Sequence, residues 1–416
     1  MSNQPPQVAP QRVIIVGAGL GGLCLAQGLR KAGISVAVYE RDASAAARAQ
    51  GYRVSMDVRG MEALRECVPP KLYQLFEATC GQPSTGLTMF STDGPSLRED
   101  STTRFPTEVR PGIALAGRAV DRLTLREILL AGLDDAVHFG KELIGYEMLP
   151  DGIQARFADG STASGDLLVG ADGVSSRVRE QHLPELAPVD AGIRWVGGRT
   201  TLDDRLRALL PDALSDRAAT VRDGGILVFL ASVLFRQRPG VAARTLWPGL
   251  RFTDNQDFLM WAIVGEKDRM MRPEGELAAA SPAALHHFAL EATACAHPML
   301  RAVVEAADPD RSFFLAVRAI PIADQRPGSR VTLLGDAMHA SPVNGTGANS
   351  ALQDAALLCR HLCRAAQEPG GLERAVHQFE LEMLGEVRAT RAAMHAAWSH
   401  LTWNDAWKSP GELGLT

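Results

Sequence analysis

The chain has 416 residues, a net charge of −5, and 46% hydrophobic and 22% charged residues. At about 100–200 residues per domain, this length predicts two or three domains. An acidic chain lacks the basic footprint of a nucleic-acid-binding protein. No apolar run reaches the ~18 residues of a membrane span. We therefore expect a soluble globular protein that binds neither nucleic acid nor a membrane.

The N-terminus and the six cysteines bear on the compartment. The first ten residues, MSNQPPQVAP, lack the basic and apolar regions of a signal peptide. No two cysteines form a CxxC pair, which fits a reducing cytoplasm best. Cys359, His361 and Cys363 lie in a helical pattern. We interpret them as helix packing because a structural zinc needs four ligands, and a metal site is the alternative.

The segment from Arg12 to Asp42, RVIIVGAGLGGLCLAQGLRKAGISVAVYERD, predicts a strand, a glycine turn, a helix and a second strand. Residues 13–16 form a continuous apolar run, which is typical of a buried parallel strand. The helix is expected from about Gly21 to Lys31, ending near Gly33. Residues 36–39 form the second strand, so this segment is a βαβ unit.

Gly17, Gly19 and Gly22 form a G-x-G-x-x-G pattern between strand and helix. Glycines here permit a tight turn, a close approach of backbone to a pyrophosphate, and close helix–strand packing. Glu40 ends the next strand, where a carboxylate can bind ribose hydroxyls, as in FAD or NAD. A tight turn without a ligand is the alternative. The expected cofactor contacts are Gly17, Gly19, Leu20, Gly22, Glu40 and Arg41.

The following segments predict helices and then strands. MEALRECV and KLYQLFEAT look helical, and residues 120–133 form a stronger amphipathic helix with Leu125, Ile128 and Leu129 on one side. IQARFADGSTASGDLLVGADG alternates around a turn and then predicts a buried strand that ends at Gly170.

GADGVSSRVR, residues 170–179, follows that strand. Asp172 and Gly173 predict a tight turn at the carboxyl end of the strand. Ser175 is expected to cap the next helix, with Arg177 and Arg179 in its first turns. An ordinary capped turn is the alternative to a ligand-binding role.

The middle of the chain, about residues 186–327, changes in texture. GGILVFLASVLFR and RFTDNQDFLMWAIVGEKD predict antiparallel strands, and SPAALHHFALEATA and HPMLRAVVEAA predict helices. We expect one residue of His286–His287 to be buried and the other exposed. Phe229, Phe235, Phe258 and Trp261 are candidates to line a pocket, with simple core packing as the alternative.

A strand, a glycine loop and a long helix return in VTLLGDAMHASPVNGTGANSALQDAALL, residues 331–358. Asp336 lies at the carboxyl end of a strand, where ligands bind in open α/β sheets. Gly345 and Gly347 leave bare N–H donors at a helix start, whose positive dipole end stabilises negative charge. His339 is interpreted as a turn residue that bonds the backbone.

These segments together resemble the class A FAD-dependent monooxygenases, the family with the para-hydroxybenzoate hydroxylase fold. The resemblance covers nearly the whole chain and rests on GAGLGG with Glu40, GADGVSSRVR and LLGDAMHASPVNGTGANSALQDA. VDRLTLREILL also fits the family pattern and makes Arg122 an expected FAD contact, with a solvated arginine as the alternative. Pro342–Val343 departs from the paired prolines of the family's active-site loop.

The resemblance implies further roles. Asp336 would hold the ribityl and pyrophosphate region, and Asp172 belongs to a motif linked to FAD and NAD(P)H. Arg48 and Arg53 fall where relatives, including tetracycline-inactivating monooxygenases, contact the flavin or the nicotinamide. The residues expected along the pyrimidine edge of the flavin are Gly345, Gly347, Ala348 and Asn349.

The resemblance also implies noncovalent FAD, reduction by NADPH or NADH, and transfer of one oxygen atom from O2 through a flavin C4a-hydroperoxide. The substrate would be an aromatic or polycyclic small molecule, because charged clusters are missing from the middle of the chain; Arg236 and Arg238 leave an acid open. No catalytic base is predicted. A flavin-dependent reductase of the same fold and a non-catalytic flavin-binding protein remain alternatives. A halogenase lacks support because RWVGG has no Trp-x-Trp-x-Ile-Pro motif.

The expected architecture is an α/β, Rossmann-type FAD-binding domain with an inserted mixed or antiparallel substrate sheet and C-terminal helices. The predicted limits are 1–185 and 328–370 for the FAD-binding domain and 186–327 for the substrate domain, with parts of 85–115. A helical segment, 371–416, ends the chain. Trp398, Trp403 and Trp407 there could cap the pocket or join a subunit contact. A monomer or homodimer is expected.

Overall fold

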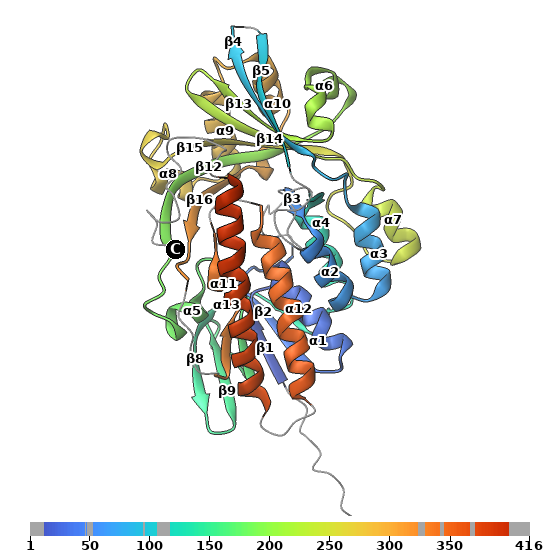
Figure 1. Cartoon of the computed structure of the whole chain (residues 1–416), viewed down its shortest axis with the longest axis vertical. Helices are drawn as coiled ribbons and strands as arrows, with labels where there is room; N and C mark the ends of the chain where they lie inside the picture. The colour runs from blue at the N-terminus through green and yellow to red at the C-terminus, as the bar shows by residue number, and fades with distance from the viewer. Residues whose placement is uncertain are drawn as a thin grey trace, which may run out of the picture.

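The computed structural model describes residues 12–45, 47, 53–94, 96–105, 117–322, 329–341, 345–366 and 371–398, the last five as backbone. A parallel five-stranded sheet forms one half of the elongated molecule (Figure 1). Its strand order is β17-β11-β1-β2-β7. The strands are β1 (Arg12–Val16), β2 (Ser35–Glu40), β7 (Val137–Phe139), β11 (Leu167–Gly170) and β17 (Val331–Leu333). Residues 13–16 are fully buried, as a strand covered on both faces requires.

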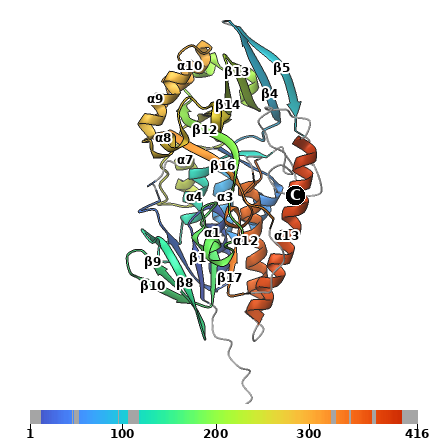
Figure 2. The same cartoon turned by 90° about the vertical axis from the view of Figure 1, so that its left-hand side faces the viewer.

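Helices cover one face of this sheet, and a small antiparallel sheet covers the other (Figure 2). Helix α12 packs against α1, α2 and α13. The helices of this half are α1 (Leu20–Lys31), α2 (Val58–Cys67), α3 (Pro70–Thr79), α4 (Arg122–Leu130), α5 (Arg177–His182), α11 (Asp336–His339), α12 (Gly347–Ala365) and α13 (Gly371–Trp398). The small sheet has β8 (Leu143–Leu149), β9 (Gly152–Phe157) and β10 (Thr162–Gly165).

Two local predictions were wrong by a few residues. The amphipathic helix begins at Arg122, because residues 118–121 form a strand and the Asp121 carboxylate accepts the Thr124 N–H at 3.0 Å. Helix α5 is capped by Ser176, whose hydroxyl accepts the Arg179 N–H at 2.9 Å. The neighbouring Ser175 is exposed.

A seven-stranded sheet forms the other end of the molecule (Figure 1). Its order is β16-β12-β15-β14-β13-β4-β5, and every neighbouring pair is antiparallel except β13 and β4. Its strands are β4 (Gly86–Asp93), β5 (Ser96–Arg104), β12 (Val189–Thr201), β13 (Ala218–Asp223), β14 (Ile226–Val233), β15 (Phe258–Glu266) and β16 (Phe313–Ala319). Around them lie α6 (Asp204–Leu209), α7 (Pro239–Leu246), α8 (Glu274–Ala279), α9 (Pro282–Ala292), α10 (Pro298–Glu305), η1 (Asp212–Ser215), η2 (Lys267–Arg269) and η3 (Pro309–Arg311).

Between the two halves lies a two-stranded sheet of β3 (Arg53–Met56) and β6 (Arg118–Asp121). Both β3 and β6 contact β14 of the large sheet, and β3 also contacts α12. This junction is therefore where a ligand could touch both halves. Among the described residues, no helix is long and apolar enough to cross a membrane.

Candidate cofactor and substrate site

The glycine turn lies between β1 and α1, at the carboxyl edge of the five-stranded sheet. Gly17 has φ +104° and donates its N–H to the Tyr39 carbonyl at 2.8 Å. A Cβ on Gly17 would overlap the Ala171 backbone, and one on Gly22 would overlap the Gly17 carbonyl. Glycine is therefore required at both positions. The start of α1, at Gly19 and Leu20, follows with no side-chain cap.

Glu40 at the end of β2 lies beside this turn. Its carboxylate accepts the N–H of Ala18 at 2.8 Å and of Asp42 at 3.0 Å. The guanidinium of Arg126 lies 3.8 Å from the same carboxylate and donates to the Ala18 carbonyl at 2.9 Å. Arg126 is nearly fully buried. Arg41, the next residue after Glu40, is exposed.

Sequence reasoning missed Arg126. The signal was present, because Arg126 follows Leu125 directly in an amphipathic helix whose residues are otherwise apolar on that side. A buried arginine needs acceptors, and here two backbone carbonyls, of Ala18 and Ala45, supply them. Arg122, which was predicted, is half-buried at the start of the same helix.

Asp172 lies two residues after β11. Its Cα is close to Gly17, because a Cβ on Gly17 would lie 2.8 Å from it. One carboxylate oxygen accepts the Arg177 N–H at 2.8 Å. The other oxygen is buried and has no hydrogen-bond partner among the described residues. Burial raises the pKa of Asp172. A buried acceptor without a partner marks a position that a ligand can satisfy.

Asp336 begins α11, three residues after β17, and is exposed. It faces the start of α12, because a Cβ on Gly347 would lie 3.4 Å from an Asp336 carboxylate oxygen. Gly345 has φ +79°, and a Cβ there would meet no atom of the described residues within 4 Å. The first N–H groups of α12 have no acceptor within the helix. Bare backbone therefore faces open space beside a carboxylate.

Asn349 ties the start of α12 to β3. Its side-chain amide donates to the Ser55 carbonyl at 2.8 Å, and its oxygen accepts the Asp57 N–H at 2.9 Å. Asn349 is buried, so its side chain is occupied by the protein and only its backbone can face a ligand. Ala348 beside it is half-buried.

His339 differs from the expectation of a turn residue that bonds the backbone. It lies in α11, is buried, and its Nε2 is 2.6 Å from the Asp354 carboxylate on α12. Burial opposes the charge on His339, but the Asp354 carboxylate outweighs it and raises the pKa of His339. Asp354 also accepts the Gly335 N–H at 2.8 Å. The pair therefore fixes the turn that carries Asp336.

The cysteines of α12 pack against helices. A Cβ on Gly28 of α1 would lie 2.9 Å from the Cys359 sulfur and 3.1 Å from that of Cys67. His361 lies 3.2 Å from Glu382. No group of side chains that could hold a metal ion occurs in the part of the chain that the structure describes.

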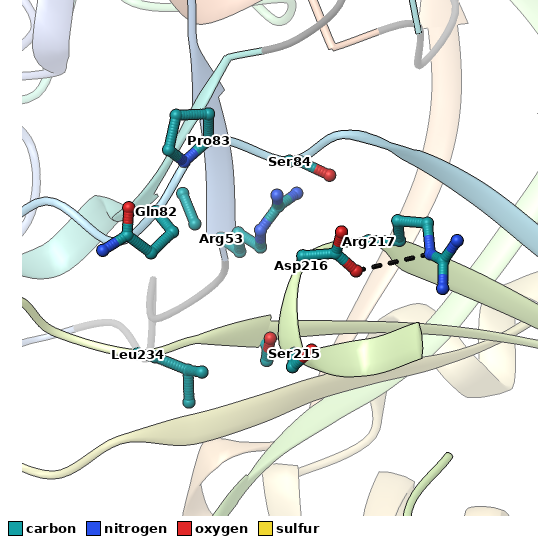
Figure 3. A pocket seen from close by; sticks show the side chains of 10 residues that line it. Arg53, Gln82, Pro83, Ser84, Ser215, Asp216, Arg217 and Leu234 are labelled. Atoms are coloured by element: carbon teal, nitrogen blue, oxygen red, sulfur yellow. Dashed lines mark ion pairs between the residues drawn. The ribbon is translucent and has the colours of Figure 1, made fainter. Parts of the chain in front are cut away.

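A polar pocket opens at the junction of the two halves (Figure 3). The empty space in this pocket is about 270 Å³, including space that is open to solvent. Arg53 enters it from β3, on the side of the large sheet rather than of the glycine turn. The lining residues are Arg53, Gln82, Pro83, Ser84, Ala119, Ser215, Asp216, Arg217, Ser232 and Leu234.

The four aromatic residues predicted as possible lining, Phe229, Phe235, Phe258 and Trp261, do not line this pocket. Trp261 and Phe258 are fully buried, and the Trp261 indole donates to the Thr200 hydroxyl at 3.1 Å. Phe229 packs against Trp195 at 5.5 Å between ring centroids. Of the histidine pair, His286 is buried and His287 exposed, as predicted. Arg48, Pro342–Val343, Trp403 and Trp407 lie outside the described residues.

The residues present fit a dinucleotide such as FAD. The turn at Gly17 leaves bare backbone, Asp172 keeps a buried oxygen without a partner, and Gly345 opens onto free space. All three lie at the carboxyl edge of one parallel sheet, where open α/β sheets bind ligands.

Comparison with known proteins decides the family. The model of the family described as FAD binding domain matches residues 11–197 and 304–377. The chain belongs to this family. The elcB protein of Phaeosphaeria nodorum, a dual O-methyltransferase/FAD-dependent monooxygenase, is 34% identical over 83% of this chain and 39% of its own length. The FAD-dependent monooxygenase dbaB of Emericella nidulans is 30% identical over 86% of this chain and 88% of its own.

A solved structure from Photorhabdus luminescens subsp. laumondii, described as a candidate FAD-containing monooxygenase, has a TM-score of 0.72. It is 29% identical and covers 94% of this chain and 99% of its own. These findings confirm the resemblance to class A FAD-dependent monooxygenases and the predicted fold class. The chain described here spans less than half the length of the dual-function relatives that it matches.

Proposed function

We propose that the chain binds FAD noncovalently and acts as an NAD(P)H-consuming monooxygenase. It inserts one oxygen atom from O2 into an aromatic or polycyclic small molecule. The observation that carries the proposal is the cradle at the carboxyl edge of the five-stranded sheet, made of the Gly17 turn, Asp172 and the start of α12. The names of elcB and dbaB support the reaction class.

The residue roles follow from position. Backbone N–H groups at Gly19, Leu20 and Gly22 receive the pyrophosphate at the positive end of α1. Gly17, whose N–H is bonded to the Tyr39 carbonyl, forms the turn that lets the pyrophosphate approach. Glu40 and Arg41 receive the ribose, Asp336 the ribityl chain, and Asp172 completes its bonding with the bound cofactor. The bare start of α12 faces the flavin ring through Gly345, Gly347, Ala348 and Asn349. Arg122 and Arg48 are further contacts in this scheme.

Bound FAD would supply the electron transfer from NAD(P)H to O2 and the oxygen transfer to the substrate. The chain supplies the rest: it orients the ring at the start of α12, and it presents the substrate from the junction pocket. We place the protein in the cytoplasm as a monomer or homodimer, with a small organic molecule as its partner in the reaction.

Turnover under ¹⁸O2 tests this proposal. FAD-loaded protein is mixed with NADPH or NADH and a panel of polycyclic phenols, quinones and aromatic acids. The masses of the products are then measured by mass spectrometry. One ¹⁸O atom per product molecule, with NAD(P)H and O2 consumed together, is the expected result. Flavin reduction with a reduced product and no ¹⁸O would instead identify a reductase. Failure of both nicotinamides to reduce the flavin would leave a binding protein.

A further inference from the structure

The side chain of Arg53 has no hydrogen-bond or ion-pair partner in the part of the chain that the structure describes. Its Nε is buried and donates no hydrogen bond to any described residue, and the guanidinium forms no ion pair with a described side chain. Its backbone N–H lies 3.4 Å from the sulfur of Met260 on β15. Arg53 is half-buried, and a partly desolvated guanidinium without an acceptor is costly. Such groups cluster at functional sites.

The carboxylate in the same pocket is already occupied. Asp216 accepts the Thr85 hydroxyl at 2.8 Å and lies 3.3 Å from the Arg217 Nε. Asp216 therefore neutralises Arg217 rather than Arg53. The hydroxyl oxygen of Ser84 is also buried and has no hydrogen-bond partner in the described part of the chain. The Arg217 Nε also lacks a hydrogen bond, but Asp216 neutralises its charge. The Arg53 guanidinium and the Ser84 hydroxyl, which lie in the same pocket, have no such partner among the described residues (Figure 3).

The pocket lies close to the place where the flavin ring is expected. Arg53 precedes Ser55 by two residues on β3, about 7 Å along a strand. The Ser55 carbonyl is bonded by Asn349 at the start of α12. A ligand held by Arg53 therefore lies between the large sheet and the bare start of α12.

We propose that Arg53 anchors an anionic oxygen of the substrate, a carboxylate or an ionised phenol or enol, and that Ser84 bonds the same group. This inference rests on the proposed function and narrows its substrate class to acidic aromatic or polycyclic compounds. Arg53 becomes a specificity-determining residue for the substrate instead of a flavin contact. The fork of a guanidinium matches a carboxylate better than a lysine does.

The burial of Arg53 fits this role. It lowers the pKa of Arg53 to about 10, which leaves the side chain charged at neutral pH. The charge lies in the pocket before any ligand arrives. An anionic ligand offsets the cost of that buried charge, whereas a neutral analogue of the same shape does not.

Calorimetric titration of the FAD-loaded protein tests the anchor without turnover. Two matched pairs of probes are used: 2-naphthoate with 2-naphthamide for a carboxylate, and 4-nitrophenolate with 4-nitroanisole for a phenolate. Wild type is expected to bind at least one anion about 10-fold or more tightly than its neutral partner. Which pair shows the preference identifies the source of the anionic oxygen.

Variants assign that preference to Arg53. Arg53→Met is expected to abolish it, Arg53→Lys to weaken it, and both to retain FAD with wild-type affinity. Arg98→Met is the matched control, because Arg98 forms an exposed pair with Asp100 on β5 and does not line the pocket, and it keeps the preference. Thermal unfolding of ligand-free Arg53→Met is expected at or above the wild-type Tm, because an unpaired buried charge is removed.

Several results would overturn the inference. Equal binding, or no binding, of anion and neutral partner in wild type refutes it. Loss of FAD in Arg53→Met or Arg53→Lys also refutes it, because Arg53 would then be a flavin contact. A clear fall in the Tm of Arg53→Met refutes it as well, because Arg53 would then have a structural partner. Because each readout is a binding or stability measurement, these outcomes are distinct from an absence of ¹⁸O in the product.

Discussion

The buried pair of His339 and Asp354 yields a prediction with a definite pH dependence. Both side chains are only 6% exposed, and their 2.6 Å contact joins α11 to α12. Replacing His339 by leucine leaves the Asp354 carboxylate buried, with the Gly335 N–H as its remaining donor among the described residues. Removal of one member of a buried ion pair costs about 3–5 kcal/mol. We expect a loss of that size at about pH 6.

The loss should shrink as the pH rises. The folded pKa of His339 is raised above its unfolded value of about 6.5. The pair therefore contributes fully below the unfolded pKa, and its contribution is lost as the pH passes through the folded pKa. At pH 9 the difference in unfolding free energy between wild type and His339→Leu should be smaller than at pH 6. Above the folded pKa it approaches the value of a neutral hydrogen bond, about 1 kcal/mol.

Urea unfolding followed by tryptophan fluorescence at both pH values measures this difference. His287→Leu is the matched control, because His287 and Glu291 form an exposed pair at 3.2 Å. It is expected to leave the unfolding midpoint unchanged. A difference below about 1 kcal/mol at pH 6 for His339→Leu, or one that grows with pH, would refute the pairing argument.

Three further substitutions test the cradle and the core. Gly347→Ala adds a Cβ that meets, among the described residues, only the Asp336 carboxylate. The free energy of unfolding of the ligand-free protein should therefore stay the same or rise by about 0.5–1 kcal/mol. Fluorescence titration should show at least 10-fold weaker FAD binding. Gly17→Ala combines φ +104° with overlap on the Ala171 carbonyl, so urea unfolding should show a loss of about 1–3 kcal/mol or more and FAD retention should fall. Trp261→Ala should cost about 3–5 kcal/mol in urea unfolding without changing 2-naphthoate affinity, because the indole is core. A large change in the affinity of Trp261→Ala for 2-naphthoate would instead place Trp261 in the pocket.

The sequence predicted the parallel sheet well because its strands are continuous apolar runs between glycine turns. Residues 13–16 and 167–170 are buried along their whole length, and such runs have few alternative structures. The edge of the large sheet was harder to predict. Strand β5, SLREDSTTR, is mostly exposed and polar, so its pairing with β4 leaves no apolar pattern in the sequence.

The functional site divides in the same way. The glycines and acids of the cofactor cradle could be predicted because each belongs to a short motif with a fixed spacing, at the end of one strand. The capping residue Ser176 was missed in favour of Ser175, since two adjacent serines cap equally well in a sequence pattern. The pocket was missed because its residues come from β3, β6, β14 and the segments around residues 82–84 and 215–217, and no local pattern joins them.

Arg126 and Arg53 show most clearly what a sequence withholds. Both are arginines within segments that pack into the protein, and the sequence around each residue does not show which groups its guanidinium meets. The partners of Arg126 are backbone carbonyls at Ala18 and Ala45, which are far away in sequence and meet it only through the fold. Arg53 meets no such acceptor among the described residues. The same side chain is therefore structural in one place and free to bind a ligand in the other, and only the tertiary arrangement separates the two cases.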